Sequence, residues 1–383
     1  MQCANCGKVN QSDPQLCPSC GHSLSLISPV HVRVSSVAIA ATIFAAAAII
    51  GFVTFLAAGG ASRVPRAPLA SNMGAIVSSV AGLIAIVLGI AGIASIWQSG
   101  GRRTGMVFAF FAFLTPMCLF GLVAAYAMIS NIGATADGAV CGSNLSGIGK
   151  AILIYANDFR GEFPRAGGNK TRWTGRTPNW AAKDRNEAFG LNEGQGQTTI
   201  AASLYLLVKY AEATPKTFVC PGDKGTTELI PRKYGAADRD LIDLWDFGPN
   251  PAKHCSYSYH MPYGKYALTS SGNPDMPVAA DRNPLQDGPF KKAKDFKRFS
   301  WRDRESAKYG NAYAHENEGQ WVLFLDGHVE FRKTPTCGLN EDNIYTIQDG
   351  NDIKIGTAPT IGSEPANRQD SLLVTDGAGS DAD

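Results

Sequence analysis

Three long stretches without a charged residue divide this chain of 383 residues. No Asp, Glu, Lys or Arg occurs in residues 34–62, 67–101 or 104–136. From residue 137 onward the chain is polar and charged, and soluble domains do not segregate their charge in this way. A helix needs about 20 apolar residues to cross a bilayer. The sequence therefore predicts three transmembrane helices, over residues 35–58, 73–97 and 106–130.

Two Cys-x-x-Cys pairs precede the first apolar stretch. Four thiolates at this spacing can surround one tetrahedral Zn²⁺, and a glycine follows the second cysteine of each pair. The segment resembles the short zinc-ribbon heads found before membrane spans in many bacterial proteins. Two disulfides are the alternative, but no signal peptide precedes the pairs. We expect a zinc ribbon over residues 1–24, with structural Zn²⁺ bound by Cys3, Cys6, Cys17 and Cys20.

The flanking basic residues predict the orientation of the spans. Lys8, Arg33, Arg102 and Arg103 lie on one side, and Arg63 and Arg66 on the other, so the positive-inside rule places the N-terminus in the cytoplasm. A thiolate–zinc head also suits the reducing side of the membrane. Three spans then place the C-terminal domain outside. The expected location is a bacterial inner membrane, with a cytoplasmic N-terminus and a periplasmic C-terminal domain.

A helix-period segment follows the third stretch and continues from Cys141 as CGSNLSGIGKAILIYANDFRGEFP. We expect a break across Gly133–Gly142 and a helix end near Asp158. This segment is similar to the post-helix region of the pseudopilin-like proteins abundant in planctomycetes. Three later segments are similar to other landmarks of that family: FVCPGD at 218–223, SYSYH at 256–260 and HENEGQWVLFLDGHV at 315–329. Residues 89–96 and the turn after them resemble a small two-helix bacterial membrane domain of unknown function.

The resemblance implies an α+β fold with a pilin-like domain, in which a helix packs on an antiparallel sheet, over residues 137–356. Residues 321–324 and 329–331 read as strands joined by a tight turn at Asp326-Gly327. Ile344–Ile355 could form a last hairpin, and residues 357–383 read as a disordered acidic tail. Two departures from the family stand out. The gap between His315 and Asp326 holds ten residues instead of nine, and no span begins with the family's cleaved leader, so processing into a pilus is not expected.

Candidate site residues in the C-terminal domain have structural alternatives. A metal or hydrolase site could use His315, Asp326 and His328, but Gly327 and Asp326 already have a turn role. Loop carboxylates could bind Ca²⁺, as in some type II secretion pseudopilins; the candidates are Asp275, Asp281, Asp287 and Asp303. Four cysteines could form two disulfides, and we predict the pairs Cys220–Cys255 and Cys141–Cys337, with free thiols as the alternative.

The sequence favours a non-enzymatic, membrane-anchored protein with a structural or interaction role at the cell envelope. Its expected partners are the lipid bilayer and a protein of the envelope or secretion machinery. The net charge of +2 and the absence of a phosphate-binding loop argue against nucleic acid and nucleotide. The basic segment 291–304 reads as a solvated loop that could contact an anionic surface. Two alternatives remain: a zinc-ribbon membrane sensor, and a periplasmic metal-dependent hydrolase using His315, Asp326 and His328.

Overall fold

The computed structural model describes residues 19–21, 33–57, 68–100, 103–288 and 291–377. They form two compact units, residues 1–131 and residues 132–383. We describe each unit by itself and call them the N-terminal and the C-terminal unit. Three predicted zinc ligands, Cys3, Cys6 and Cys17, lie outside the described residues, whereas Cys20 lies in a turn with Ser19.

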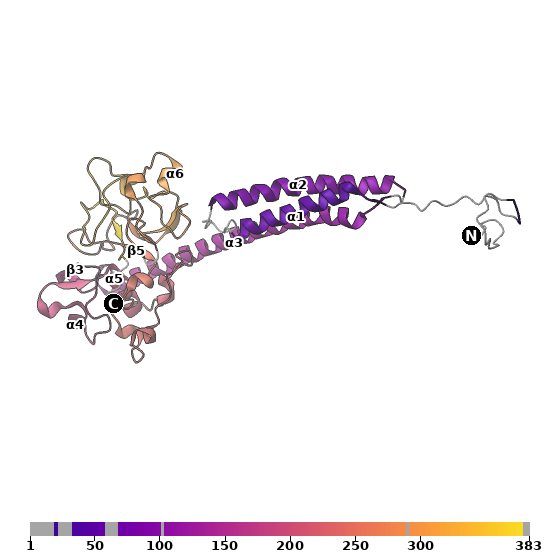
Figure 1. Cartoon of the computed structure of the whole chain (residues 1–383). Coiled ribbons are helices and arrows are strands. Elements are labelled where there is room, and N and C mark those ends of the chain that lie inside the picture. The colour runs from indigo at the N-terminus through magenta and orange to yellow at the C-terminus, as the bar shows by residue number, and fades with distance from the viewer. Residues whose placement is uncertain (1–18, 22–32, 58–67, 101–102, 289–290, 378–383) are drawn as a thin grey trace. The chain divides into compact units, whose positions relative to one another are not determined.

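Long apolar helices make up the described part of the N-terminal unit. They are α1 (Ser36–Ala57), α2 (Pro68–Gln98) and the first part of α3 (Met106–Asp158) (Figure 1). A short parallel pair, β1 (Arg33–Val34) and β2 (Arg103–Thr104), joins the starts of α1 and α3. Among the described residues, α1, α2 and α3 are long and apolar enough to cross a membrane, which indicates a membrane protein.

The apolar segments of α1 and α2 follow the predicted spans, but that of α3 lies further along. Mean hydropathy is 2.4 over both Ser36–Thr54 and Ser78–Gln98. In α3 the segment that meets the same criterion is Asp137–Asp158, with a mean hydropathy of 1.2, and half of it is buried within the protein. The predicted third span begins in the shorter apolar stretch Met106–Leu122. The later segment is a core helix of the C-terminal unit.

Small side chains fill the helix contacts of the N-terminal unit, and large apolar ones point outward. Ala41, Ala45, Ala85 and Ala112 form one buried cluster, and a Cβ on Gly89 would approach the Ala109 carbonyl oxygen to 3.1 Å. Small residues at the contacts, which let helix backbones approach closely, are typical of helices packed in lipid. The outward-facing side chains are at least half exposed; they include Ile43, Leu83, Val87, Phe110 and Phe120.

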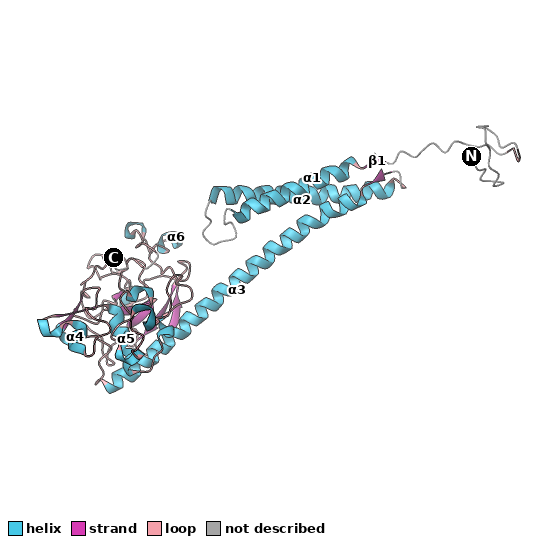
Figure 2. Cartoon of the chain, turned by 60° about the horizontal axis from the view of Figure 1, so that its bottom comes forward, coloured by secondary structure: helices cyan, strands magenta, loops and turns pink. Residues whose placement is uncertain are grey.

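A five-stranded antiparallel sheet is the centre of the C-terminal unit. Its order is β8-β7-β6-β5-β9, with β5 (Tyr257–His260), β6 (Pro277–Asp281), β7 (Gln320–Phe324), β8 (Val329–Arg332) and β9 (Leu373–Val374). The end of α3 packs on this sheet (Figure 2). Shorter elements complete the unit: β3 (Thr171–Trp173), β4 (Gly196–Thr198), α4 (Arg185–Phe189), α5 (Ile200–Tyr210) and α6 (Arg304–Ala307).

Helix α3 is continuous, so the predicted break across Gly133–Gly142 is wrong. A glycine in a helix costs only about 1 kcal/mol relative to alanine, and burial on the sheet outweighs that cost. Two glycines even help the packing, because a Cβ on Gly142 would lie 3.0 Å from the Trp321 ring and one on Gly149 would lie 2.7 Å from Leu323. The helix ends at Asp158 as expected, and Gly161 follows with φ +82°.

The strand prediction around Asp326-Gly327 is confirmed. Strands β7 and β8 pair antiparallel, with Trp321 opposite Phe331 and Leu323 opposite Val329. The Gly327 backbone has φ +90°, and its N–H donates to the Phe324 carbonyl at 2.9 Å. The expected hairpin within Ile344–Ile355 does not form. In its place an isolated bridge joins Ile347 to Thr357.

The C-terminal segment is part of the core, so the predicted disordered tail is wrong through residue 377. Leu372, Leu373 and Val374 are fully buried, and β9 pairs with β5. Beyond β9, the Asp376 carboxylate accepts hydrogen bonds from the backbone N–H groups of Ile200 and Ala201 at the start of α5, at 3.0 and 2.8 Å. The prediction failed because it relied on the acidic composition of this segment, whereas carboxylates such as that of Asp376 have buried hydrogen-bond partners. Residues 378–383 lie outside the described residues.

Candidate functional site

One disulfide joins helix α3 to the loop after α5, and it differs from both predicted pairs. It links Cys141 to Cys220, whose Cα atoms are 5.2 Å apart. Cys255 is a buried thiol and Cys337 a partly buried one, so the pairs Cys220–Cys255 and Cys141–Cys337 are wrong. The pair Cys220–Cys255 was predicted because both cysteines flank sheet-type segments, and Cys141–Cys337 was the pair that remained. The structure instead brings Cys220 to the helix, where Asn144 also donates a hydrogen bond to the Val219 carbonyl at 3.0 Å.

A buried histidine–carboxylate pair lies beside this disulfide. His315 Nε2 is 3.1 Å from Asp281 Oδ2, and their side chains are 8% and 0% exposed. The same imidazole nitrogen lies 3.8 Å from Cys220 Sγ. Asp281 ends strand β6, and its Oδ2 also accepts the Trp321 backbone N–H at 2.7 Å. The pair therefore ties the end of β6 to β7 and to the loop that carries His315.

Burial and charge act in opposite directions on the pKa of His315. Burial lowers this pKa by disfavouring the imidazolium, but the hydrogen bond and the negative charge of Asp281 outweigh burial, so the net pKa is raised. Protonated His315 thus stabilises the folded state. This stabilisation is complete below the ordinary pKa of histidine, near 6.5, and is lost as pH rises through the raised pKa.

Replacing His315 should therefore lower the stability of the folded state less at alkaline pH than at acidic pH. We expect His315→Gln to lower the Tm of the full chain in non-ionic detergent most at pH 6, and the difference from the wild type to shrink towards pH 9. Thermal unfolding across that pH range measures it. His328→Gln removes an exposed histidine and serves as the control, with a small effect expected. A loss for His315→Gln that grows with pH would contradict the assignment.

A second buried ion pair lies one residue further along the chain from Asp281. Arg282 and Asp223 are both 6% exposed, and Arg282 Nη2 lies 3.1 Å from Asp223 Oδ2. Arg282 also donates to the carbonyls of Ala252 and Cys255. Asp223 ends the FVCPGD segment, which contains the disulfide cysteine Cys220. Adjacent residues at the end of β6 thus hold the His315 loop on one side and the loop after Cys220 on the other.

The three residues of the hydrolase alternative do not meet. Asp326 and His328 lie in the exposed turn beyond Phe324, where His328 Nδ1 is 2.6 Å from Asp326 Oδ1 and the ring stacks on Phe324. His315 lies at the opposite end of β7, near Trp321. At about 3.3 Å per residue, the strand separates the two ends by more than about 10 Å. Metal bonds near 2 Å cannot span that distance.

The carboxylates considered for Ca²⁺ are also dispersed. Asp281 is buried against His315, Asp287 accepts the backbone N–H of Ala293, and Asp303 caps helix α6 through the Ser306 N–H. Each of these three thus has a local structural partner. The fourth candidate, Asp275, is exposed, and its backbone N–H donates to Asn273 Oδ1 at 3.0 Å. Where the chain is described, the group with metal-ligand proximity is Cys141, Cys220, Asp281 and His315, whose ligand atoms lie within 4.8 Å of one another. In the disulfide state both sulfurs are bonded to each other, and only Asp281 and His315 offer a ligand atom.

Sequence reasoning placed His315 in a motif but missed its partner. The available signal was the segment Pro277–Asp281, an apolar strand that ends in a carboxylate followed by an arginine. Consecutive charges at the end of a buried strand need partners, because an unpaired buried charge is costly. Comparison of the chain with protein-family models, with curated proteins and with solved structures found no match.

Proposed function

We propose that this protein is a non-enzymatic, membrane-anchored protein that presents a pseudopilin-like domain outside the cytoplasm. The Cys141–Cys220 disulfide carries the proposal. Disulfides persist in oxidising compartments and are rare in the cytosol, so a disulfide in the core supports a periplasmic C-terminal unit. The zinc ribbon, with Cys3, Cys6, Cys17 and Cys20 as ligands of Zn²⁺, would lie on the reducing side. An odd number of spans connects the two compartments.

The packing of the site supports a structural or interaction role. His315, Asp281, Asp223 and Arg282 hold together the end of β6 and the loops around it, and all four side chains are almost completely buried. Because His315 and Asp281 are buried against each other, this pair has no access to a substrate. The outward-facing apolar side chains of α1 and α2 support lipid as one partner, since exposed patches of this kind mark membrane or protein contacts. A protein of the envelope or secretion machinery is the other proposed partner.

Reporter fusions at the two ends of the chain test the proposed topology. Alkaline phosphatase is active only outside the cytoplasm, so its fusion after residue 383 should be active and its fusion before residue 1 inactive. Green fluorescent protein does not fluoresce when it is exported in an unfolded state. Its fusion before residue 1 should therefore fluoresce and its fusion after residue 383 should not. Non-reducing peptide mapping should find the Cys141–Cys220 bridge in protein from membranes. A fluorescent C-terminal fusion would contradict the topology, and hydrolase turnover lost in His315→Ala would contradict the non-enzymatic role.

A further inference from the structure

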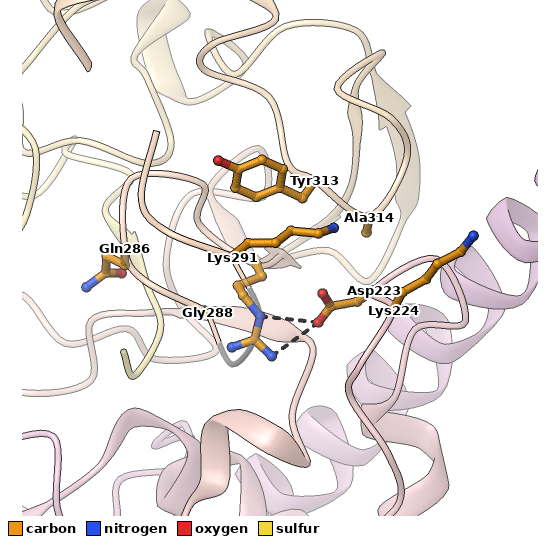
Figure 3. Close-up of a pocket in the computed structure, with 8 residues that line it drawn as sticks. Asp223, Lys224, Gln286, Gly288, Lys291, Tyr313 and Ala314 are labelled. Atoms are coloured by element: carbon orange, nitrogen blue, oxygen red, sulfur yellow. Dashed lines mark hydrogen bonds and ion pairs between the residues drawn. The ribbon is translucent and has the colours of Figure 1, made fainter. Parts of the chain in front are cut away.

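A basic pocket lies next to the Asp223–Arg282 ion pair in the C-terminal unit (Figure 3). Loops from four parts of the chain form it: the loop after Cys220, the segment after β6, the start of the basic segment 291–304, and the segment before His315. Its lining residues are Asp223, Lys224, Arg282, Gln286, Gly288, Lys291, Tyr313 and Ala314.

Positive charge is in excess in this pocket. Lys224, Arg282 and Lys291 line it. Among the described residues that line it, the one carboxylate is Asp223, which is already paired with Arg282 through Nε and Nη2. Two positive charges therefore remain uncompensated within the lining. The fixed guanidinium also has an unused donor, because Arg282 Nη1 is buried and has no hydrogen-bond partner within the described residues. A buried donor without an acceptor is destabilising, so an acceptor oxygen that reaches Nη1 would be favourable.

The surroundings of Lys291 disfavour the charged form of its ammonium group. Its side chain extends past the Tyr313 ring, with Nζ 5.0 Å from the ring centroid, whereas Lys224 extends outward from the rim (Figure 3). Burial lowers the pKa of Lys291; Asp223 partly opposes this shift, and the positive charges of Arg282 and Lys224 reinforce it. A bound anion would favour the charged ammonium and relieve this repulsion.

We propose that this pocket binds a small oxyanion, a carboxylate or phosphate group, between Lys291 and Arg282. Lys224 at the rim adds long-range attraction, which salt would screen. The site is separate from the proposed anchoring role and does not depend on it. Lys294, three residues on, is not part of the site, because its ammonium donates to the carbonyls of Lys308 and Asn311 and holds the loop.

Isothermal titration of the full chain in non-ionic detergent tests the proposal. Inorganic phosphate and glucuronate are the two probes, and glucose is the uncharged counterpart of glucuronate. We expect binding of at least one anion and none of glucose. Lys291→Gln should weaken the affinity for the anion about 10-fold or more, since a hydrogen bond to a charged group contributes about 1.5–3 kcal/mol. The matched control is Lys292→Gln, which removes the same charge from an exposed neighbour.

The outcomes separate a built site from general charge attraction. Loss in Lys291→Gln with retention in Lys292→Gln supports the site, and the preferred probe tells a phosphate ligand from a carboxylate ligand. A smaller loss in Lys224→Gln would agree with its place at the rim. Equal losses in the Lys291 and Lys292 variants, or no heat from either anion at millimolar concentration, would overturn the proposal. A confirmed ligand would favour the sensor alternative over a purely structural module.

Discussion

Ending the chain at residue 367 should abolish cooperative unfolding of the C-terminal unit. The truncation removes β9 and Asp376. Leu372, Leu373 and Val374 are completely buried, and burying each such side chain contributes about 1.5–3 kcal/mol. The loss of Asp376 also leaves the indole N–H of Trp173 and two backbone N–H groups of α5 without their acceptor. Domains have a net stability of only about 5–15 kcal/mol, so these losses together are sufficient to unfold the unit.

A second truncation provides the control for the first. Ending the chain at residue 377 removes only residues 378–383 and should leave the Tm of the full chain in detergent unchanged. Near-UV circular dichroism reports the packed aromatic side chains and measures both variants. If the chain ending at residue 367 kept the wild-type transition, the segment would behave as the disordered tail expected from its composition, and its assignment to the core would be wrong.

Replacing both disulfide cysteines should have the next largest effect. The bridge closes a loop with a sequence separation of 79 residues, and a loop of this length corresponds to about 4–5 kcal/mol in the chain-entropy model. Measured losses for native disulfides span about 2–5 kcal/mol. For a domain of this size we therefore expect Cys141→Ala with Cys220→Ala to lower the Tm by about 5–15 °C. Calorimetry of the full chain in detergent measures the change.

Cys337→Ala is the matched control for the double replacement, since Cys337 is a partly buried cysteine outside the bridge. It should lower the Tm by much less. Adding a thiol reductant to the wild-type protein should reproduce the loss seen in the double variant and leave that variant itself unchanged. A wild-type Tm that is insensitive to reductant would show that the Cys141–Cys220 bond does not form in the protein.

The parts of the fold that were predictable have local causes. The apolar stretches at α1 and α2 need only composition and length, and the β7–β8 hairpin is encoded by alternating apolar residues around Asp326-Gly327. The helix end at Asp158 follows from Gly161. In each case the residues that determine the structure lie within a few positions of it. The sequence also predicted the coarse class, helices followed by a domain with an antiparallel sheet.

The parts that were missed depend on contacts between distant segments. Strand β9 is two residues long, and its pairing with β5 bridges more than a hundred positions. Asp376 caps α5 from 176 residues away. Helix α3 continues across Gly138, Gly142 and Gly149 where Trp321 and Leu323 of the sheet cover it. Acidic residues are more common in tails, short apolar pairs in loops, and helix glycines at helix breaks. Composition over a few positions therefore favoured the wrong structure at each of these places.

The candidate site shows the same division. His315 was singled out as part of a predicted motif, yet its partner Asp281 is 34 positions earlier and was considered only as a loop ligand for Ca²⁺. The disulfide could not be assigned because four cysteines allow three pairings. Residue type alone could not distinguish them; the deciding fact is that the loop carrying Cys220 packs against helix α3, where Asn144 bonds to Val219.

The position of the disulfide also determines how the C-terminal unit responds to mechanical tension. The unit begins at Ile132, and Cys141 lies close behind it on α3. Tension that enters the unit along the chain at Ile132 and leaves it beyond Cys220 reaches Cys141 first. There the covalent bond transfers the load to Cys220, and the segment between the two cysteines carries none of it. With the bond reduced, the segment between the two cysteines would carry this tension, and side-chain packing alone would have to resist it.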